Sequence, residues 1–558
     1  MKQYFDNFRD DFLLPSESNF EDLLSKIGFL HNKVIDASRE NVPRIPLANR
    51  YSYDTTAHSI PLKSKSSSGV LIELAAAFQG SIRWNQPTSL VNITPNPLLD
   101  SVAAASIAAL YNTNAFWDYC SGNVTLFEKD VVQFLSHLAG WDQKRVAGLS
   151  TSGGKATLMY AIKCGLNICD RGAVTKGLQA KYVVIAGKTS HYSIEDNCNY
   201  LGIGRENVLR VDVDQTGAMI PSSFEETLRK ALIQKKKVAA IITLGGDTLE
   251  HTIDPVKEIF DIRTRLVQEF ALDYSPLLHL DSVNAWVGMA FREYDFGTNP
   301  LGIDTDVLEK IHTLSTRIRE VQWADSFGAD FHKTGLAPYV SSFFVIKQGM
   351  QLHSINKDVL LEERPAYRYG EVHTHHISFE NSRSASGILG AWVSIQRLGV
   401  EGYQRYWAQL MTVGSYIRHA IRTKYNDEIR VLNTTALGHP NVIQLVPPDF
   451  TATYEELLVN DAAREKYSEY CFGLYDYMAY ELLKSNQPYT LLGFVPSYKY
   501  EQTGVKRPAF LAYLNHPHVD EKTCDTLLQQ IITMKHTFEA QRNSARAKTI
   551  KHFKHLPK

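Results

Sequence analysis

Short apolar runs alternate with amphipathic stretches between about residues 145 and 350. Runs rich in β-branched residues predict strands, and stretches with apolar residues at helical spacing predict helices. Four strands are expected, at 182–186, 238–243, 277–281 and 343–346, and two of the helices at 221–235 and 255–269. Strands and helices that alternate in this way are typical of an α/β region with a mostly parallel sheet.

The flanking parts of the chain carry different patterns. Residues 1–90 mix short helical patterns with a polar serine-rich loop, which indicates an arm that packs on the body or on a second subunit. From residue 384 a long helix precedes two more strands and closing helices, a pattern typical of a smaller α+β domain. We therefore expect an N-terminal arm, a large domain and a small C-terminal domain, at 1–90, 91–383 and 384–558.

Residues 348–382 carry few periodic signals. A loop of this length within a compact domain is usually a functional lid or a disordered segment. We expect this one to be a lid that closes over a site.

Composition excludes several classes of function. The 558 residues include 59 basic and 60 acidic side chains, so no overall field attracts nucleic acid or an anionic membrane. No apolar run approaches the roughly 20 residues that a membrane helix needs, and the N-terminus lacks the apolar core of a secretion signal. The six cysteines form no Cys-x-x-Cys pair, which argues against a disulfide framework or a metal site. We expect a cytoplasmic protein with reduced thiols and no bound metal.

The chemically distinctive stretch is Asp325 to Tyr339, which contains His332-Lys333 and precedes an apolar run that reads as a buried strand. A lysine at the mouth of such a strand is partly desolvated, which favours its neutral, nucleophilic amine. Taken alone, Lys333 is more often an ordinary surface lysine. Four upstream features change this interpretation, because ligands of such sheets bind at the carboxyl ends of the strands.

Two of these features suit a flat, phosphorylated cofactor. Gly153 and Gly154 lie in a run of small residues that opens a helix, where bare backbone N–H groups can bind a phosphate. His191 follows the strand at 182–186 and could stack its ring on an aromatic ligand. A histidine in such a position is also frequently structural.

The other two features follow the next two strands. Thr243 begins a glycine turn and offers a hydroxyl group. Asp281 ends an apolar strand, and a buried carboxylate there needs a cation, such as a protonated pyridine nitrogen. The five features together, in this order, indicate a pyridoxal 5'-phosphate (PLP) site.

From about residue 92 to its C-terminus the chain resembles the group II PLP-dependent amino-acid decarboxylases, the family of glutamate, aromatic-amino-acid and tyrosine decarboxylases. The resemblance implies the type I PLP fold and a homodimer with one lid over the partner's site. It rests on the following motifs: Asn96-Pro97, residues 121–128, Gly153-Gly154, His191-Tyr-Ser-Ile, Thr243 through Asp254-Pro255, Asp281, His332-Lys333, Arg397-Leu-Gly399 and Asn515-His-Pro517.

The resemblance also implies roles for individual residues. Lys333 would form the internal aldimine, His191 would stack on the pyridine ring, and Asp281 would pair with its nitrogen. Gly153 and Gly154 would bind the phosphate, with His332 beside it and Thr243 near the ring's 3-hydroxyl. The lid would supply a tyrosine acid, for which Tyr367 and Tyr369 are the candidates.

The chain departs from the family's pattern at several positions. The family usually has two alanines after the aspartate, where this chain has Ser282-Val283, and a serine and a glutamate where it has Gly154-Lys155. An arginine that some members carry shortly before the late Asn-Pro turn is replaced by Phe510. The residue that recognises the substrate carboxylate is therefore open, and the available cations are Arg507, Arg383 and Lys155.

The function that follows is decarboxylation of an aromatic or acidic L-amino acid to the amine. An aldehyde lyase of the kind that cleaves sphingosine phosphate is the alternative, since it shares the fold and a similar His-Lys context. A PLP fold kept only for binding or scaffolding is a third hypothesis, which the joint presence of Lys333, Asp281 and His191 disfavours.

Overall fold

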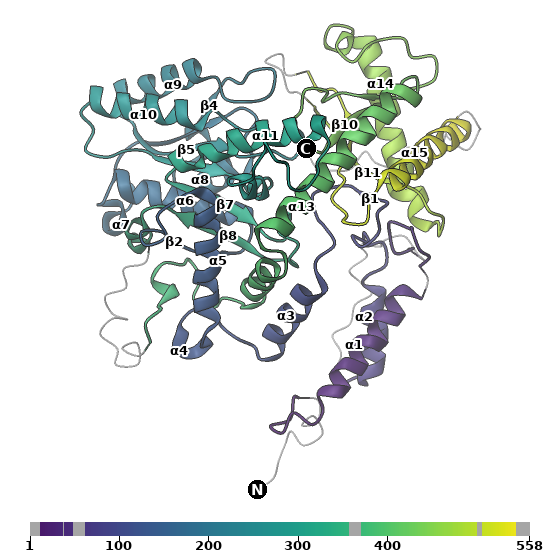
Figure 1. The fold of residues 1–558 in the computed structure, drawn as a ribbon, viewed down its shortest axis with the longest axis horizontal. Coiled ribbons are helices and arrows are strands. Elements are labelled where there is room, and N and C mark those ends of the chain that lie inside the picture. The colour runs from purple at the N-terminus through teal and green to yellow at the C-terminus, as the bar shows by residue number, and fades with distance from the viewer. Residues whose placement is uncertain (1–11, 37, 48–61, 356–369, 499–504, 543–558) are drawn as a thin grey trace.

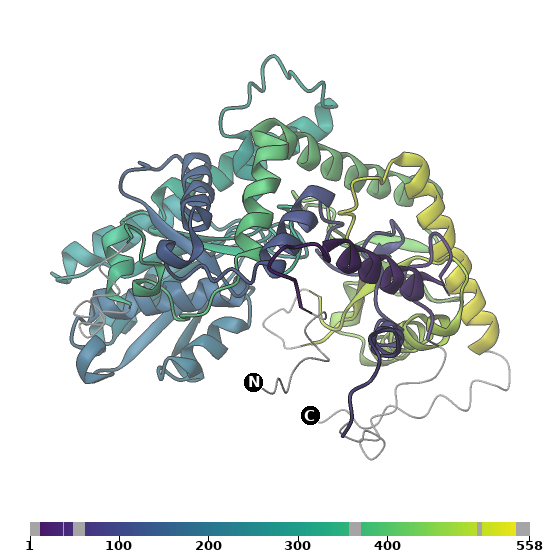
Figure 2. The ribbon, with the colours of Figure 1, turned by 90° about the horizontal axis from the view of Figure 1, so that it is seen from below.

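The computed structural model describes residues 12–36, 38–47, 62–355, 370–498 and 505–542. Two bodies, each built around a sheet, lie side by side, and a helical arm projects from them (Figures 1 and 2). The larger body holds every strand predicted between residues 145 and 350, and therefore the predicted site.

The sheet of the larger body has seven strands in the order β2-β8-β7-β6-β5-β3-β4. The strands from β7 to β4 pair in parallel, and β8 runs antiparallel between β2 and β7. The strands are β2 (Ala147–Thr151), β3 (Tyr182–Gly187), β4 (Val208–Val211), β5 (Lys237–Leu244), β6 (Leu277–Asp281), β7 (Ser326–Asp330) and β8 (Ser342–Ile346). The α/β class with a mostly parallel sheet is confirmed.

Helices cover both faces of this sheet, and each face has its own apolar core. Helix α6 (Gly154–Cys169) lies on one face and contacts β5 to β8. Its Gly165 lies so close to the sheet that an added Cβ would be 2.2 Å from the carbonyl oxygen of Ala239. This close fit brings the N-terminus of α6 to the strand ends. The other face carries α5 (Val124–Ala139), α9 (Pro221–Ile233), α10 (Val256–Glu269) and α11 (Thr305–Ile318).

The smaller body contains a five-stranded sheet in the order β1-β11-β12-β10-β9. Its first strand comes from the N-terminal part of the chain and pairs in parallel with β11. The strands are β1 (Ser89–Leu90), β9 (Ile429–Val431), β10 (Asn441–Leu445), β11 (Leu491–Val495) and β12 (Ala509–Ala512), and the helices are α14 (Asp461–Asp476) and α15 (Glu521–Arg542). The N-terminal region therefore contributes a strand to the smaller body as well as the helices of the arm.

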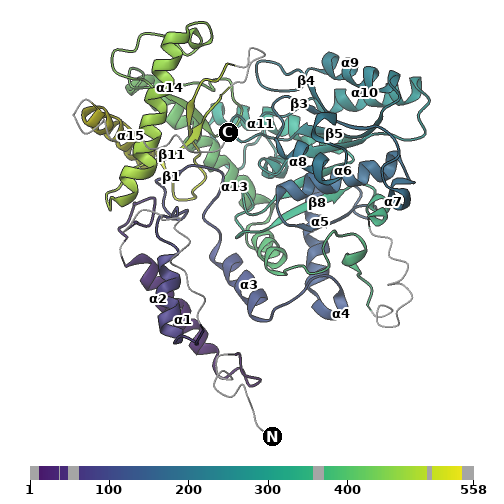
Figure 3. The same ribbon diagram turned by 180° about the vertical axis from the view of Figure 1, so that it is seen from behind.

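One long helix, α13 (Ser386–Lys424), runs from the larger body into the smaller one (Figure 3). It bends at Gly399, whose φ of 58° lies in the left-handed region that glycine tolerates. Helix α3 (Leu99–Leu110) packs on its first half, where the Ser101 hydroxyl donates to the carbonyl of Gly390. Because of this bend, a single helix packs against the apolar cores of both bodies.

The arm consists of α1 (Phe20–Ile35) and α2 (Ser67–Ala76), which contact each other and project from the two bodies (Figure 1). Helix α1 buries none of its residues, and apolar side chains such as Ile27 and Ile72 are about half exposed. Across the described ranges, no helix has the length and apolarity that crossing a membrane requires.

Candidate active site

Sheet register brings the site together. Asp281 ends β6 opposite Leu244 of β5 and Gly328 of β7, and Asp330 lies two residues beyond Gly328. Side chains two residues apart on a strand point to the same face, so Asp281 and Asp330 share the face that α6 covers. Two carboxylates and the N-terminus of a helix therefore meet at one edge of the sheet.

The N-terminus of α6 forms a narrow cradle. Gly153 has a φ of 124°, which favours glycine, and Gly154 begins the helix. A Cβ on Gly154 would lie 2.9 Å from Oδ2 of Asp330 and 3.2 Å from Cγ1 of Val283, so a side chain here would crowd the site. The first backbone N–H groups of a helix have no partner within it, so this glycine pair can present them to a phosphate.

Asp281 is a buried carboxylate, 8% exposed. Its Oδ1 has no hydrogen-bond partner among the described residues. Burial raises the pKa of Asp281 to about 6, the charge of Asp330 adds to this, and the charge of Lys333 opposes it. A cation placed against Oδ1 would relieve this cost, as the nitrogen of a protonated pyridine ring does.

Lys333 follows β7 and precedes β8, which begins at the same edge because it runs antiparallel to β7. Its Nζ lies 2.8 Å from Oδ2 of Asp330, and its side chain is 18% exposed. The other oxygen of Asp330 accepts a hydrogen bond of 2.6 Å from the hydroxyl of Ser342. The lysine is thus held at the strand ends, with its side chain partly exposed.

His191 lies between β3 and α8 (Ser193–Tyr200), at the rim of the site. Its Nδ1 lies 2.7 Å from the hydroxyl of Ser193 and accepts a bond of 3.2 Å from the Ser193 N–H, which orients the ring. Partial desolvation, followed by the charge of Lys333, lowers the pKa of His191. The ring is therefore neutral near pH 7 and suited to stacking on a flat ligand.

His332 is buried beside Lys333. Its Nδ1 lies 2.9 Å from the carbonyl oxygen of Ser341, its Nε2 lies 3.5 Å from Oδ2 of Asp330, and its ring contacts that of Tyr339. Burial lowers the pKa of His332, and the charge of Asp330 works against this effect.

Thr243 lies on β5 but out of phase with Asp281. It pairs in register with Leu280, so it points to the opposite face, and its hydroxyl donates to the carbonyl of His279 at 2.9 Å. Its assignment to the 3-hydroxyl of the cofactor stays a prediction, and the strand alternation weighs against it.

The three cations considered for substrate recognition are already engaged. Arg383 forms a buried ion pair with Glu128 and donates to the carbonyls of Ala115 and Ser150. Lys155, in the first turn of α6, pairs with Asp196 at 2.7 Å. Arg507 is buried in the smaller body, where it donates to the carbonyl of Tyr454 at 2.8 Å and lies over its ring.

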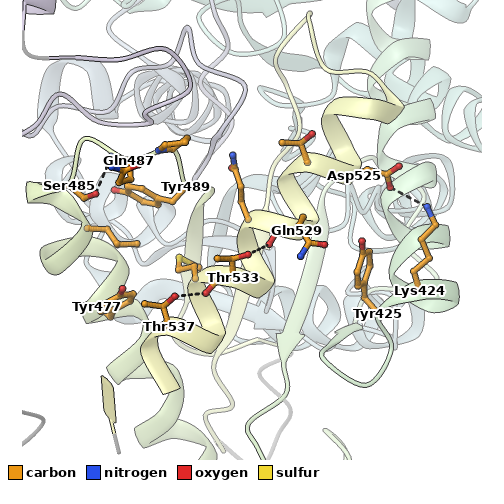
Figure 4. A pocket seen from close by; sticks show the side chains of 15 residues that line it. Lys424, Tyr425, Tyr477, Ser485, Gln487, Tyr489, Asp525, Gln529, Thr533 and Thr537 are labelled. Atoms are coloured by element: carbon orange, nitrogen blue, oxygen red, sulfur yellow. Dashed lines mark hydrogen bonds and ion pairs between the residues drawn. The ribbon is translucent and has the colours of Figure 1, made fainter. Parts of the chain in front are cut away.

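Other predicted features lie elsewhere or outside the described ranges. Tyr367 and Tyr369 fall within 356–369, which the structure does not describe, so their role in the lid stays a prediction. An open hollow of about 740 Å³ lies in the smaller body, between α15 and the segment before β11 (Figure 4). Its lining, which includes the ion pair of Lys424 and Asp525, lacks the lysine, carboxylate and glycine cradle of the larger body.

Two residues of the site were missed from the sequence, Asp330 and its partner Ser342. The signal for Asp330 was available, because an acid at the end of a buried strand is as informative there as it is at Asp281. The strand itself, β7, has no β-branched residue, so its sequence gave little indication of a strand.

The residues present fit PLP. The unpartnered oxygen of Asp281 suits the pyridinium nitrogen, and the cradle of Gly153 and Gly154 suits the phosphate. Lys333 supplies an amine at the same edge of the sheet. Among the described residues, no cluster of histidines, cysteines and carboxylates could hold a metal ion.

Comparisons with known proteins agree with this geometry. The model of the pyridoxal-dependent decarboxylase conserved domain matches residues 79–443. The chain is 21% identical to L-2,4-diaminobutyrate decarboxylase of Acinetobacter baumannii over 61% of its length, and 24% identical to acidic amino acid decarboxylase GADL1 of Bos taurus over 62%. These alignments span only 62% and 61% of the two relatives.

The fold is also found among solved structures. The crystal structure of Oryza sativa TDC with PLP and tryptamine superposes with a TM-score of 0.73 at 15% identity, covering 96% of this chain and 99% of that one. Both bodies of the structure therefore have counterparts in a known fold.

Proposed function

Because this chain belongs to the pyridoxal-dependent decarboxylase family, whose cofactor is PLP, we propose that it releases CO2 from an L-amino acid to give the amine. The observation that carries the proposal is the presence, at the same edge of the sheet, of Asp281, a buried carboxylate with a free oxygen, and of Lys333, which contacts Asp330. The free oxygen of Asp281 calls for a cation that the described residues do not place against it, and the amine of Lys333 could bond to a carbonyl group.

In this proposal each residue of the site has one task toward the cofactor. Lys333 would hold it covalently, Asp281 would keep a proton on its ring nitrogen, and His191 would stack on its ring. The N–H groups at Gly153 and Gly154 hold its phosphate, with His332 at the side. When bound, the cofactor supplies an electron sink for the pair left by the departing carboxylate. The protein's part is to orient the substrate and to exclude water.

We propose a substrate with an aromatic or an acidic side chain. Since Arg383 and Lys155 are paired within the protein, neither is ready to bind an acidic side chain, and the aromatic alternative gains support. The proposed lid, 348–382, would close over the substrate and supply Tyr367 or Tyr369 as an acid.

We also propose that the protein is a cytoplasmic homodimer. The half-exposed apolar side chains of α1 and α2 support a second copy as their partner, since surface of this kind is usually covered. None of the six cysteines is in a disulfide, as expected of a reducing compartment. Light scattering of the purified protein would measure the mass of the assembly.

The test of function is CO2 release and amine formation from the twenty L-amino acids by PLP-loaded protein, with Lys333→Ala as the control. Turnover of one amino acid by the wild type alone would support the proposal and identify the substrate. PLP binding at Lys333 without CO2 release from any of them, together with aldehyde formation from a phosphorylated amino alcohol, would contradict it.

A further inference from the structure

Asp330 is the most enclosed ionisable group of the site. It is fully buried, and its backbone carbonyl accepts a hydrogen bond of 3.1 Å from the indole N–H of Trp286. One carboxylate oxygen accepts from Ser342, and the other lies 2.8 Å from Lys333 Nζ. The carboxylate therefore has a fixed position and a single close cation.

The same oxygen also lies at the N-terminus of α6. A Cβ on Gly154, the first residue of that helix, would be 2.9 Å away from it. The carboxylate therefore lies beside the positive end of the helix, although among the described residues no N–H donates a hydrogen bond to this oxygen. This is the place that the proposed function assigns to the cofactor's phosphate.

The charged groups around Asp330 would not neutralise a second anion, such as the cofactor's phosphate. On its own turn it faces His332 and Lys333, and burial keeps His332 largely neutral. Strand β6 presents another carboxylate, Asp281, and β8 presents only the hydroxyl of Ser342. On α6 the nearest cation, Lys155, is paired with Asp196. At the rim, His191 has a lowered pKa and is therefore largely neutral near pH 7, with Asp196 and Arg210 as the charged groups near it.

We propose that Asp330 makes capture of PLP dependent on proton uptake, an inference that rests on the proposed function. The carboxylate and the phosphate share one helix end, and Lys333 can no longer serve as a free ammonium partner of Asp330 once it is bonded to the cofactor. Like charges at this separation in a buried site repel strongly. One proton is therefore taken up at the carboxylate–phosphate pair as the cofactor binds, and affinity falls as the pH rises.

The experiment compares PLP with pyridoxal, which lacks the phosphate. Dissociation constants are measured by equilibrium dialysis between pH 6.5 and 8.5 for the wild type, Asp330→Asn and Asp212→Asn. Asp212 is an exposed carboxylate paired with Lys188, so its change removes the same charge from the surface and leaves the glycine cradle intact. Asparagine keeps the shape of Asp330 and can still accept from Ser342.

We expect Asp330→Asn to tighten PLP binding at pH 8 at least about tenfold more than it tightens pyridoxal binding, and to flatten the pH dependence. Asp212→Asn should change neither ligand's affinity. An equal effect of Asp330→Asn on both ligands would overturn the proposal. Such a result would show that Asp330 acts only through Lys333, because both ligands bond to this lysine and only PLP carries a phosphate.

A second measurement needs no variant. Calorimetry in two buffers of different ionisation enthalpy counts the protons taken up by the wild type at pH 8. About one more proton with PLP than with pyridoxal would support the proposal, and equal numbers would overturn it. If the wild type binds PLP without a borohydride-trappable adduct on Lys333, the proposed function itself is wrong, and this inference fails with it.

Discussion

The guanidinium of Arg383 and the carboxylate of Glu128 form a buried ion pair, in which both side chains are about 5% exposed or less. The carboxylate also accepts from the N–H of Ser150, and Arg383 donates to the Ser150 hydroxyl. The pair therefore ties the segment before α13 to α5 and to β2, the strand that leads to the glycine cradle. This relationship gives Arg383 a structural role in place of the substrate contact that its charge suggested.

Arg383→Ala should reduce the free energy of unfolding by about 3–5 kcal/mol, because it leaves Glu128 buried without its cation. Urea unfolding of the cofactor-free protein would measure this. Arg405→Ala is the control, since Arg405 pairs with Glu401 on the exposed side of α13 and should cost about 0.5 kcal/mol or less. A loss as small as the control's would contradict a structural role for the buried pair.

Lys333→Ala should reduce CO2 release by roughly a thousandfold or more, as expected when the group that holds the reacting centre is removed. Circular dichroism would establish that the variant is folded. Lys347→Ala, which removes a lysine that donates to the carbonyl of Gln322 at the far end of β8, is the matched control and should retain activity. Comparable losses in both variants would remove Lys333 from its proposed role.

Asp281 should destabilise the cofactor-free protein as the pH rises. Its pKa is raised to about 6, so between about pH 4 and 6 the folded state binds more protons than the unfolded state, and stability falls through that window. Asp281→Asn should remove this slope and stabilise the cofactor-free protein at pH 7 by on the order of 1–3 kcal/mol. It should also weaken PLP binding. Unfolding curves from pH 4 to 7 that are parallel for the two proteins would contradict this account.

A buried aromatic cluster between the two bodies should make the protein sensitive to acid. His251 and His439 are fully buried against each other and against Trp407 and Tyr513, and neither nitrogen of His439 has a hydrogen-bond partner among the described residues. Burial lowers the pKa of His251 to about 3 and that of His439 well below its usual value. These neutral rings are compatible with folding only while they stay unprotonated.

Because the unfolded histidines bind protons near pH 6.5 and the folded ones do not, stability is fully present above that pH and is lost as the pH falls below it. The loss should reach about 1.4 kcal/mol per pH unit for each histidine. His439→Leu should reduce the slope measured by urea unfolding between pH 6 and 4.5 by about 1.4 kcal/mol per pH unit. His419→Leu, on the exposed part of α13, should leave it unchanged.

Alanine at position 153 and alanine at position 154 should impair the protein for different reasons, although both replace a glycine of the cradle. Nothing lies within 4 Å of a Cβ on Gly153, so its variant suffers only from the positive φ, at about 1–3 kcal/mol. Gly154→Ala should crowd Asp330 and weaken PLP binding while changing stability less. PLP affinity would be measured by dialysis. Equal effects of both variants on this affinity would contradict the expectation that a side chain at position 154, and not at 153, crowds the phosphate site.

Local pattern was sufficient for the elements with strong apolar runs. Strands β3, β5, β6 and β8 and helices α9 and α10 lie within one or two residues of their predicted bounds, because β-branched runs and helical periodicity report directly on burial. The short strands β2, β4 and β7 were missed. Their pairing depends on neighbours distant in the chain, which local propensity does not reveal.

The sequence by itself determined the identity of the reactive groups, since Lys333, Asp281, His191 and the glycine pair carry their chemistry in residue type and order. Only the tertiary structure decided which charges meet. It places Asp330 against Lys333 and the N-terminus of α6, gives Arg383 to Glu128, and turns Thr243 to the opposite face from Asp281. The contacts of Asp330 with α6 and of Arg383 with Glu128 join residues more than a hundred positions apart, and sheet register sets the direction of Thr243. The electrostatic outcome depends on distances and burial that no local pattern encodes.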